Sequence, residues 1–296
     1  MKRIYHNNCS ICQSVNIKST ITLKDHSHTG EKFTVFECCD CGFHFTQNIP
    51  NEESIGSYYQ SENYISHSDT QKGLFFKAYH IVRDYMLRKK RNLVKSSTGL
   101  KSGKLLDIGS GTGYFANSMI NGGWKAEGIE QDKKTRIFSE NKFQFKVHDT
   151  KELYKLPPES FNAITMWHVL EHVHDLHGYL TKIHSILKSE GVFIVAVPNH
   201  KSFDQEHFKE FWAAWDIPIH LWHFNPSTIK KLMDEFDFNI EKEVPMPFDA
   251  VYVSMLSEHY KSGSKLIGLL KGLFFALKGK LNPMRCSSVI YIVRKK

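Results

Sequence analysis

The sequence predicts an α/β protein with a doubly wound, mostly parallel sheet and a small cysteine-rich module ahead of it. From residue 104 onward, short apolar segments alternate with helical ones, which is the order of a parallel sheet covered by helices on both faces. A run of glycines follows the first apolar segment, and five of the six cysteines lie within the first 41 residues. The chain is 41% hydrophobic and 24% charged, as in globular proteins, which excludes disordered, collagen-like and coiled-coil chains.

The cysteine-rich module is expected to hold a metal. Its cysteines form two C-x-x-C pairs, which are Cys9 with Cys12 and Cys38 with Cys41. Each pair fits a tight turn, and four thiolates at tetrahedral positions suit Zn²⁺. Short strands are expected at 15–23 and 32–37, so the sequence predicts a structural zinc ribbon. A disulfide or a redox pair is the alternative, and Cys39 could replace Cys38 as a ligand, although the spacing favours Cys38.

The composition changes along the chain and indicates three regions. A polar and aromatic stretch follows the ribbon, and a helix is expected at 74–94 because apolar residues recur there at spacings of three and four. The three regions are a zinc ribbon at 1–46, a connecting aromatic segment and helix at 47–103, and an α/β domain at 104–296 with insertions at 198–226 and 245–286.

Apolar runs and helix start and stop signals predict the individual strands and helices of the α/β domain. The expected strands cover residues 104–108, 125–129, 145–147, 161–167, 192–197, 238–244 and 289–293. The expected helices cover residues 114–121, 133–140, 176–187 and 228–236. Because ligands bind at the carboxyl ends of parallel strands, the loops and insertions at that edge are expected to form the site.

The glycine-rich turn after the first strand carries the chemistry. Asp107, Gly109, Gly111 and Gly113 lie between this strand and the next helix. Glycines let the backbone turn sharply and approach a ligand closely. A carboxylate two residues before the first glycine would repel a pyrophosphate but suits an ammonium group, and Glu130, at the end of the second strand, can accept both hydroxyls of a ribose. A ligand with a ribose, an amine and no phosphate is S-adenosylmethionine.

Together with these residues, the segments 161–172 and 187–191 give a resemblance to the class I S-adenosylmethionine-dependent methyltransferases over about residues 105–238. The resemblance implies a seven-stranded Rossmann-like sheet and transfer of a methyl group from S-adenosylmethionine. A zinc ribbon joined to such a domain is similar to some sugar C-methyltransferases and to methyltransferases encoded with surface-polysaccharide genes. The chain differs from the former because it lacks their long C-terminal domain.

The resemblance also implies a set of cofactor contacts at the loop and at the following strand ends. These residues are Asp107, Gly109, Ser110, Gly111, Gly113, Glu130, Gln131, Asp149, Thr150 and Trp167. Asp149 falls near the expected adenine position. The aromatic segment from Tyr58 to Tyr64 is predicted to close over the cofactor, with Tyr64 in contact with it, and simple packing of the ribbon on the domain is the alternative.

Methyl transfer to a hydroxyl needs a proton acceptor, and histidine suits that role. The candidates are His168 and His172 near the expected methyl position, and His220 and His223 in the first insertion. Each is equally explained as a structural histidine or a substrate contact. The first two also fit H-x-x-E-H, an inverted zinc-protease motif, but the upstream cofactor loop favours a turn that lines the cleft. Nearby tryptophans either stack on an acceptor ring or form a packed lid, and they are Trp212, Trp215 and Trp222.

The net charge of +8 is concentrated in two stretches, at 83–104 and 261–296, and the second contains no acidic residue. Such stretches favour nucleic acid, anionic lipid or a phosphorylated substrate as partner, although solvated helix faces also explain them. Residues 265–280 are expected to form a helix with one apolar face and flanking lysines, although three glycines weaken it. It is too short and charged to span a bilayer, so it either lies on an anionic membrane surface or packs on the domain or a second subunit.

We therefore expect a methyltransferase that acts on a small-molecule or glycan acceptor, at oxygen rather than carbon or nitrogen. An RNA methyltransferase that grips RNA through the ribbon and the basic helix is the alternative. It is less favoured because the fourth strand ends in Met-Trp-His rather than Asn-Pro-Pro and an aromatic residue. The intact acidic and glycine positions argue against a catalytically inactive binding module. We expect a cytoplasmic protein without a secretory signal, and peripheral membrane contact through 265–280 is a hypothesis.

Overall fold

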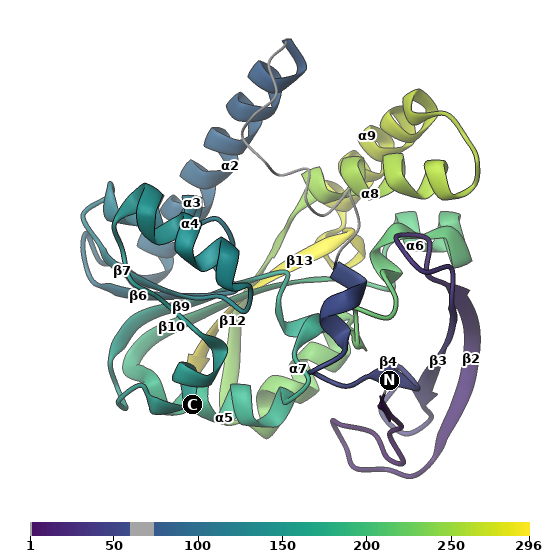
Figure 1. Cartoon of the computed structure of the whole chain (residues 1–296), viewed down its shortest axis with the longest axis horizontal. Coiled ribbons are helices and arrows are strands. Elements are labelled where there is room, and N and C mark those ends of the chain that lie inside the picture. Colours follow the sequence, from purple (N-terminus) through teal and green to yellow (C-terminus); the bar gives the residue numbers. More distant parts are fainter. Residues whose placement is uncertain (1, 60–73) are drawn as a thin grey trace.

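The computed structural model describes residues 2–59 and 74–296, with the backbone alone for 74–81, and it confirms the predicted α/β fold (Figure 1). Its central sheet has seven strands in the order β12-β13-β10-β9-β6-β7-β8. The strands from β10 to β8 are parallel, and β13 runs antiparallel between β10 and β12. The strands are β6 (Lys104–Ile108), β7 (Lys125–Ile129), β8 (Val147–His148), β9 (Phe161–Trp167), β10 (Leu187–Pro198), β12 (Phe238–Pro245) and β13 (Ser288–Lys295).

Helices cover both faces of this sheet. Neighbouring residues of a strand point to opposite faces, so they pack against different helices. Leu105 belongs to a buried cluster with Val94 and Phe115, whereas Leu106 belongs to another cluster with Leu180 and Ile229. The helices that supply these residues are α2 (Leu74–Thr98) and α3 (Tyr114–Ile120) on one face, and α5 (Leu176–Ile186) and α7 (Pro226–Glu235) on the other. A further helix, α4 (Lys133–Phe143), connects β7 to β8. All the parallel strands therefore end at one edge, where the predicted cofactor loop lies.

The ribbon forms a second sheet that includes a strand from the α/β domain. Its strands have the order β11-β4-β3-β2, and the outermost, β11, comes from the insertion after β10. In this pairing Trp222 lies opposite Phe45, and His223 lies opposite His44. The strands are β2 (Ile17–Lys24), β3 (Lys32–Cys38), β4 (His44–Thr46) and β11 (Trp222–His223), and β1 (Arg3–Ile4) pairs separately with β5 (Ile49–Pro50). The ribbon and the α/β domain are therefore joined by backbone hydrogen bonds.

Three helices form a lobe beside the sheet, at the upper right of Figure 1. They are α6 (Phe203–Phe208), α8 (Pro247–Tyr260) and α9 (Lys265–Leu281). Among the residues that the structure describes, no helix has both the length and the apolar content needed to cross a bilayer.

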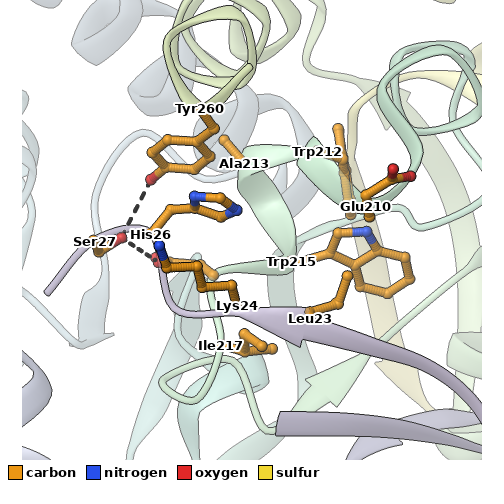
Figure 2. Close-up of a pocket in the computed structure, with 11 residues that line it drawn as sticks. Leu23, Lys24, His26, Ser27, Glu210, Trp212, Ala213, Trp215, Ile217 and Tyr260 are labelled. Carbon is orange, nitrogen blue, oxygen red and sulfur yellow. Dashed lines mark hydrogen bonds between the residues drawn. The ribbon is translucent and has the colours of Figure 1, made fainter. Parts of the chain in front are cut away.

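The ribbon also shares a hydrophobic core with the first insertion and with α8. Figure 2 shows the turn after β2 lying against this insertion. Ser27 Oγ lies 3.2 Å from Tyr260 OH and 3.2 Å from Asp216 Oδ1, and the His26 ring stacks on Tyr260 with the ring centroids 4.6 Å apart. The space enclosed here is about 10 Å³, which is room for a single water molecule. The ribbon is therefore packed firmly against the domain.

The three tryptophans of the insertion are part of this packing. Trp212, Trp215 and Trp222 are buried, and each indole N–H donates a hydrogen bond within the protein. The acceptors are Asp204 Oδ2 at 2.7 Å, the Lys209 carbonyl at 2.9 Å and the Val173 carbonyl at 2.7 Å, respectively. A buried indole has no free face on which a sugar could stack. Of the two alternatives, stacking on an acceptor ring or a packed lid, the structure therefore shows the packed lid.

Candidate functional site

The glycine loop lies at the carboxyl end of β6, between that strand and α3. Gly109, Gly111 and Gly113 all have positive φ values, of 71°, 52° and 80°. A Cβ atom at Gly109 would lie 2.3 Å from Val169 Cγ2, and one at Gly113 would lie 2.8 Å from the Phe145 ring. Any side chain at either position would therefore displace a neighbour as well as strain the backbone. At Gly111 nothing lies within 4 Å of such an atom, so the loop is open there.

Glu130, at the end of β7, holds this loop from the neighbouring strand. Its Oε2 accepts a hydrogen bond of 2.9 Å from the Gly111 N–H, and its Oε1 accepts one of 2.9 Å from the Asp132 N–H. Burial raises the pKa of this carboxyl group. Each carboxylate oxygen has a second lone pair, so Glu130 can still accept hydroxyl protons from a ribose.

Arg136 connects this carboxylate to the next strand end. Its guanidinium donates to the Glu130 carbonyl at 2.7 Å and to the Gln131 carbonyl at 2.6 Å, and it pairs with Asp149 Oδ2 at 2.9 Å. Asp149 in turn caps the following 3-10 helix, whose first residue is Thr150. The structure therefore links the residues predicted to contact the ribose and the adenine, Glu130 and Asp149, through an arginine that the sequence analysis did not predict.

Asp107 provides the negative charge of the site. Its side chain is buried, Thr165 Oγ1 donates to Asp107 Oδ1 at 2.7 Å, and burial raises the pKa of the carboxyl group to about 7. The ammonium group of Lys90 on α2 contributes a positive charge that opposes this shift, and Lys90 Nζ lies 4.3 Å from the centre of the Trp167 ring. A buried carboxylate that holds its proton so strongly gains from a ligand cation, which fits the amine of S-adenosylmethionine.

Two further polar groups at the same edge point to a ligand. Trp167 Nε1 and Ser110 Oγ are buried and have no hydrogen-bond partner among the residues that the structure describes. Buried donors without partners are uncommon, and both belong to the predicted cofactor contacts. Tyr64, the remaining predicted contact, lies outside the described residues. The described end of the aromatic segment, Tyr59, places its hydroxyl 3.2 Å from His172 Nδ1.

His168 begins the turn after β9 and is ion-paired on both sides. Its Nε2 lies 2.9 Å from Asp249 Oδ2, and its Nδ1 lies 3.5 Å from Glu171 Oε1. Although burial opposes protonation, the two carboxylates raise the pKa of His168 to about 10. Its backbone has a φ of 57°, an uncommon conformation for a residue with a side chain. His168 is therefore an imidazolium at neutral pH, and one third of its side chain is exposed (33%).

His172 and His220 lie beside it and have the opposite protonation state. Burial lowers the pKa of His172 to about 4, and burial also lowers the pKa of His220. The Nδ1 of His172 lies 2.9 Å from the Ile219 carbonyl, and the Nδ1 of His220 lies 2.9 Å from the Ala214 carbonyl. A carbonyl only accepts, so both Nδ1 atoms carry the proton. The Nε2 atom of each neutral ring is then the one that can accept a proton or bind a metal.

Glu171 completes this group. It is fully buried, and among the described residues its carboxylate oxygens have no hydrogen-bond partner of good geometry. Glu171, His172 and His220 each offer one potential ligand atom, and these three atoms lie within 4.8 Å of one another. The three residues could therefore hold a divalent ion. The motif that contains Glu171 is visible in the sequence, and the insertion with His220 was expected at the site, but the direct meeting of Glu171 and His220 was not predicted.

The fourth predicted histidine, His223, lies in a different place. It belongs to β11 and is buried, and its Nε2 lies 2.9 Å from Thr46 Oγ1 of the ribbon. Burial lowers the pKa of His223 well below its usual value. The structure therefore brings together His168, His172 and His220, but it places His223 in the contact between ribbon and domain.

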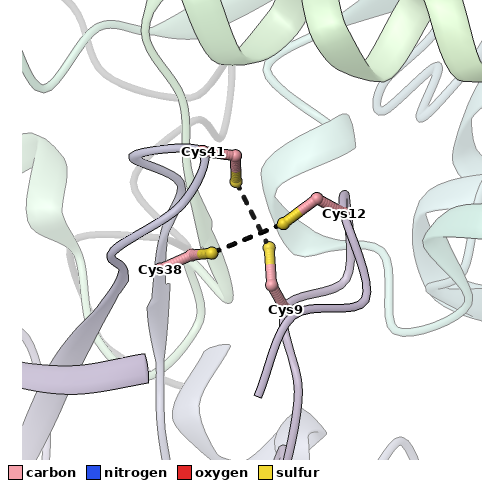
Figure 3. Close-up of side chains that lie close together, drawn as sticks. All are labelled: Cys9, Cys12, Cys38 and Cys41. Carbon is pink, nitrogen blue, oxygen red and sulfur yellow. Dashed lines mark hydrogen bonds between the residues drawn. The ribbon is translucent and has the colours of Figure 1, made fainter. Parts of the chain in front are cut away.

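The four cysteines of the two C-x-x-C pairs converge in the ribbon (Figure 3). Cys9 Sγ lies 3.5 Å from Cys41 Sγ, and Cys12 Sγ lies 3.4 Å from Cys38 Sγ. All four sulfurs lie within 4.8 Å of one another, so the cluster could hold a zinc ion. The exposed Cys39 is outside this cluster, so the spacing correctly favoured Cys38.

Comparisons with known proteins agree with this geometry. Residues 79–243, more than half of the chain, match the family described as Methyltransferase domain. The ubiquinone biosynthesis O-methyltransferase of Pelagibacter ubique (strain HTCC1062) is 31% identical over 185 residues, which cover 57% of this chain and 73% of that protein. The protein of the same name from Rhodopseudomonas palustris (strain TIE-1) is 28% identical over 130 residues, which cover 41% of this chain and 51% of that protein.

Solved structures share the fold at lower sequence identity. The geranyl diphosphate C-methyltransferase from Streptomyces coelicolor A3(2), solved with S-adenosyl-L-homocysteine, has a TM-score of 0.52 and 13% identity, and the match covers 77% of this chain and 88% of that one. The phosphoethanolamine N-methyltransferase 2 from Haemonchus contortus, solved with S-adenosyl-L-methionine, has a TM-score of 0.50 and 17% identity, with coverages of 70% and 52%. On the family match and its relatives, the chain belongs to the S-adenosylmethionine-dependent methyltransferases.

Proposed function

We propose that the enzyme transfers the methyl group to a hydroxyl oxygen of a small molecule. S-adenosylmethionine supplies an activated methyl group, so the chain has to bind it, align the acceptor and take up the acceptor proton. The observation that carries the proposal is the cluster after β9, in which His168 is an imidazolium and its neighbour His172 is a neutral imidazole. Groups of opposite protonation state in one cluster can hold an oxyanion and receive its proton.

The roles follow from exposure and charge. One third of the His168 side chain is exposed whereas His220 is buried, so the His168 imidazolium would meet the acceptor hydroxyl and favour ionisation of that hydroxyl. His172 and His220, whose Nε2 atoms carry no proton in this tautomer, are the proton acceptors in the same cluster. Asp249 is a positioning residue, because it orients His168 and keeps it protonated. The match to a relative named as an O-methyltransferase supports an oxygen acceptor.

An RNA acceptor is less well supported, because much of the basic stretch on α2 contacts the protein itself. The Arg83 guanidinium lies 4.0 Å from the Tyr114 ring centre, and Lys90 points into the cofactor edge. Arg91 donates to the Ser118 carbonyl at 3.3 Å, and Lys95 donates to the Gly122 carbonyl at 2.6 Å. These cations stabilise the packing of α2 and do not form a solvent-facing row that could bind RNA phosphates.

The proposal is tested with purified protein and methyl-labelled S-adenosylmethionine. The acceptors to compare are 3,4-dihydroxybenzoate as a phenol, a hexose as the glycan alternative, an alkylamine and transfer RNA. Label recovered in a methyl ether of the phenol or the hexose would support transfer to oxygen, and the relative rates would choose between them. Label recovered mainly in RNA or on the amine would contradict the proposal.

A further inference from the structure

Helix α9 presents its large apolar side chains to solvent rather than to the core. Leu266, Leu270, Leu277 and Leu281 are 65%, 61%, 62% and 81% exposed, and Phe274 is 56% exposed. Amphipathic helices of globular proteins normally bury this kind of face. The alternative in which the stripe packs on the domain does not fit this exposure, and the face is uncovered in the described part of the chain.

Glycines set this orientation. A Cβ atom at Gly268 would lie 2.6 Å from Met255 Cα, and one at Gly272 would lie 2.5 Å from Val251 Cα. The backbones of α8 and α9 touch at these points, which only glycine allows. We expected the glycines to weaken the helix, but here they make its inner face flat enough for close packing. That packing turns the leucines outward.

Other apolar side chains are exposed on the elements packed beside α9. On α8, Phe248 is 44% exposed and Tyr252 is 65% exposed. An open groove of about 450 Å³ lies between α6 and α9, and its lining includes Phe203, Phe274 and Phe275. Contiguous exposed apolar surfaces of this kind mark sites that contact another protein or a membrane.

The charges around this surface favour a membrane. Helix α9 itself has four lysines and no acidic residue, and two of them, Lys265 and Lys280, lie near its ends. Lys271, Lys278 and Glu206 line the groove. Lys271 Nζ pairs with Glu258 Oε1 at 2.6 Å, whereas Lys278 Nζ lies 4.1 Å from the Phe203 ring centre. In a symmetric dimer through α9 the lysines of two copies would approach one another and repel. An anionic bilayer instead pairs with the lysines and receives the leucines.

We propose that α9 lies in the surface of an anionic membrane, with its exposed leucines and Phe274 inserted and with Lys265, Lys278 and Lys280 at the lipid phosphates. The glycine contacts with α8 hold the helix in the orientation that this requires. Because the binding surface is separate from the cofactor loop, membrane binding is expected with or without S-adenosylmethionine.

The test is flotation of the full-length protein with liposomes. Vesicles of phosphatidylcholine with 30% phosphatidylglycerol are compared with vesicles of phosphatidylcholine alone, at low and at high salt. We expect the protein to float with the anionic vesicles, and at least tenfold less with neutral ones or at high salt. Protein that stays at the bottom with anionic vesicles at low salt would overturn the proposal.

Two paired variants assign the binding to α9. Leu270→Glu with Phe274→Glu changes exposed residues of α9, whereas Ile137→Glu with Phe138→Glu changes residues of α4 that are 47% and 41% exposed. We expect the α9 pair to lose at least tenfold in bound fraction and the α4 pair to float like the wild type. Both should keep the wild-type circular dichroism spectrum, because the changed side chains are exposed. Equal losses in both pairs, or a dimer by light scattering that the α9 pair abolishes without any flotation, would contradict a membrane partner.

Discussion

The Nε2 of His168 lies 2.9 Å from Asp249 Oδ2, and this ion pair joins the end of β9 to the first turn of α8. The same helix touches α9 through the backbone of Val251 and Met255. One helix therefore connects the predicted acceptor side of the active site to the exposed apolar surface.

His168→Gln is expected to lower kcat by about 10²-fold or more, because the variant loses the positive charge beside the acceptor oxygen. Since the pKa of His168 is raised to about 10, its proton is present at lower pH and is lost as the pH rises through that value. Wild-type activity should therefore fall at alkaline pH, and the variant should lack this fall. Steady-state rates across pH measure the effect.

Asp249→Asn provides the companion measurement. It removes the carboxylate that raises the pKa of His168, so the alkaline fall in activity should move to lower pH. Calorimetric affinity for S-adenosylmethionine should stay the same in both variants, since neither residue belongs to the cofactor loop. An unchanged pH profile in both would remove His168 from the reaction.

Cofactor affinity is expected to fall as the pH drops below about 7. The pKa of Asp107 is raised to that value by burial, so the group is protonated at lower pH and no longer attracts the cofactor amine. The loss should approach tenfold per pH unit, measured by calorimetry. Asp107→Asn should bind weakly at every pH and show no such dependence, and a wild-type affinity that is flat from pH 5 to 8 would contradict the assignment.

Glu130→Ala should weaken S-adenosylmethionine binding by about 1–3 kcal/mol, because hydrogen bonds to a charged group are lost. Part of the loss would come from the loop, since Glu130 also accepts from the Gly111 N–H. Glu127→Gln on the same strand is the matched control, as Glu127 pairs with Lys104 away from the loop. Equal affinities of Glu130→Ala and wild type would exclude the ribose role.

One equivalent of zinc per chain is expected in protein purified without added metal, bound by the four cysteines. Cys12→Ser should remove it and Cys39→Ser should not, because Cys39 lies outside the cluster. Elemental analysis by mass spectrometry measures the content. A second equivalent that survives Cys12→Ser and disappears in His220→Ala would locate another ion at Glu171, His172 and His220.

Trp222→Ala should destabilise the whole protein by about 3–5 kcal/mol, the usual cost of removing a buried aromatic side chain. Trp222 lies on the strand that pairs with the ribbon, so ribbon and domain should unfold in one transition. Val15→Ala, at a position that is 79% exposed, is the control and should change stability by less than about 0.5 kcal/mol. Separate melting of ribbon and domain in calorimetry would contradict this coupling.

The sheet was predictable because its strands are nearly continuous apolar runs bounded by turns. The strand at 161–167 was predicted at its observed bounds, and Leu187 was missed in β10 because a bulge separates it from Val192 in the pairing with β9. Helix α8 was also missed. Its buried residues include Ala250, Ser254 and Ser257, which are too small and polar to give an apolar stripe.

The cofactor loop was predictable because its residues are adjacent in sequence, whereas the acceptor side depends on contacts between distant segments. Glu171 and His220 meet only because the insertion folds back over the turn after β9. Lys90 sits within a row of basic residues, and nothing in its surroundings marks it as the one that turns towards Asp107. A two-residue strand such as β11 carries no periodic signal, so its pairing with β4 is visible only in three dimensions.

The pairing of β4 with β11 has a consequence for the order in which the chain is made. Thr46 leaves the ribosome long before His223, which lies 177 residues later and completes the sheet beside it. Until then one edge of the ribbon has unpaired backbone groups, and such edges readily pair with other chains. A nascent chain that has bound its metal is therefore still exposed to aggregation, and the protein is protected only when most of the methyltransferase domain has been synthesised.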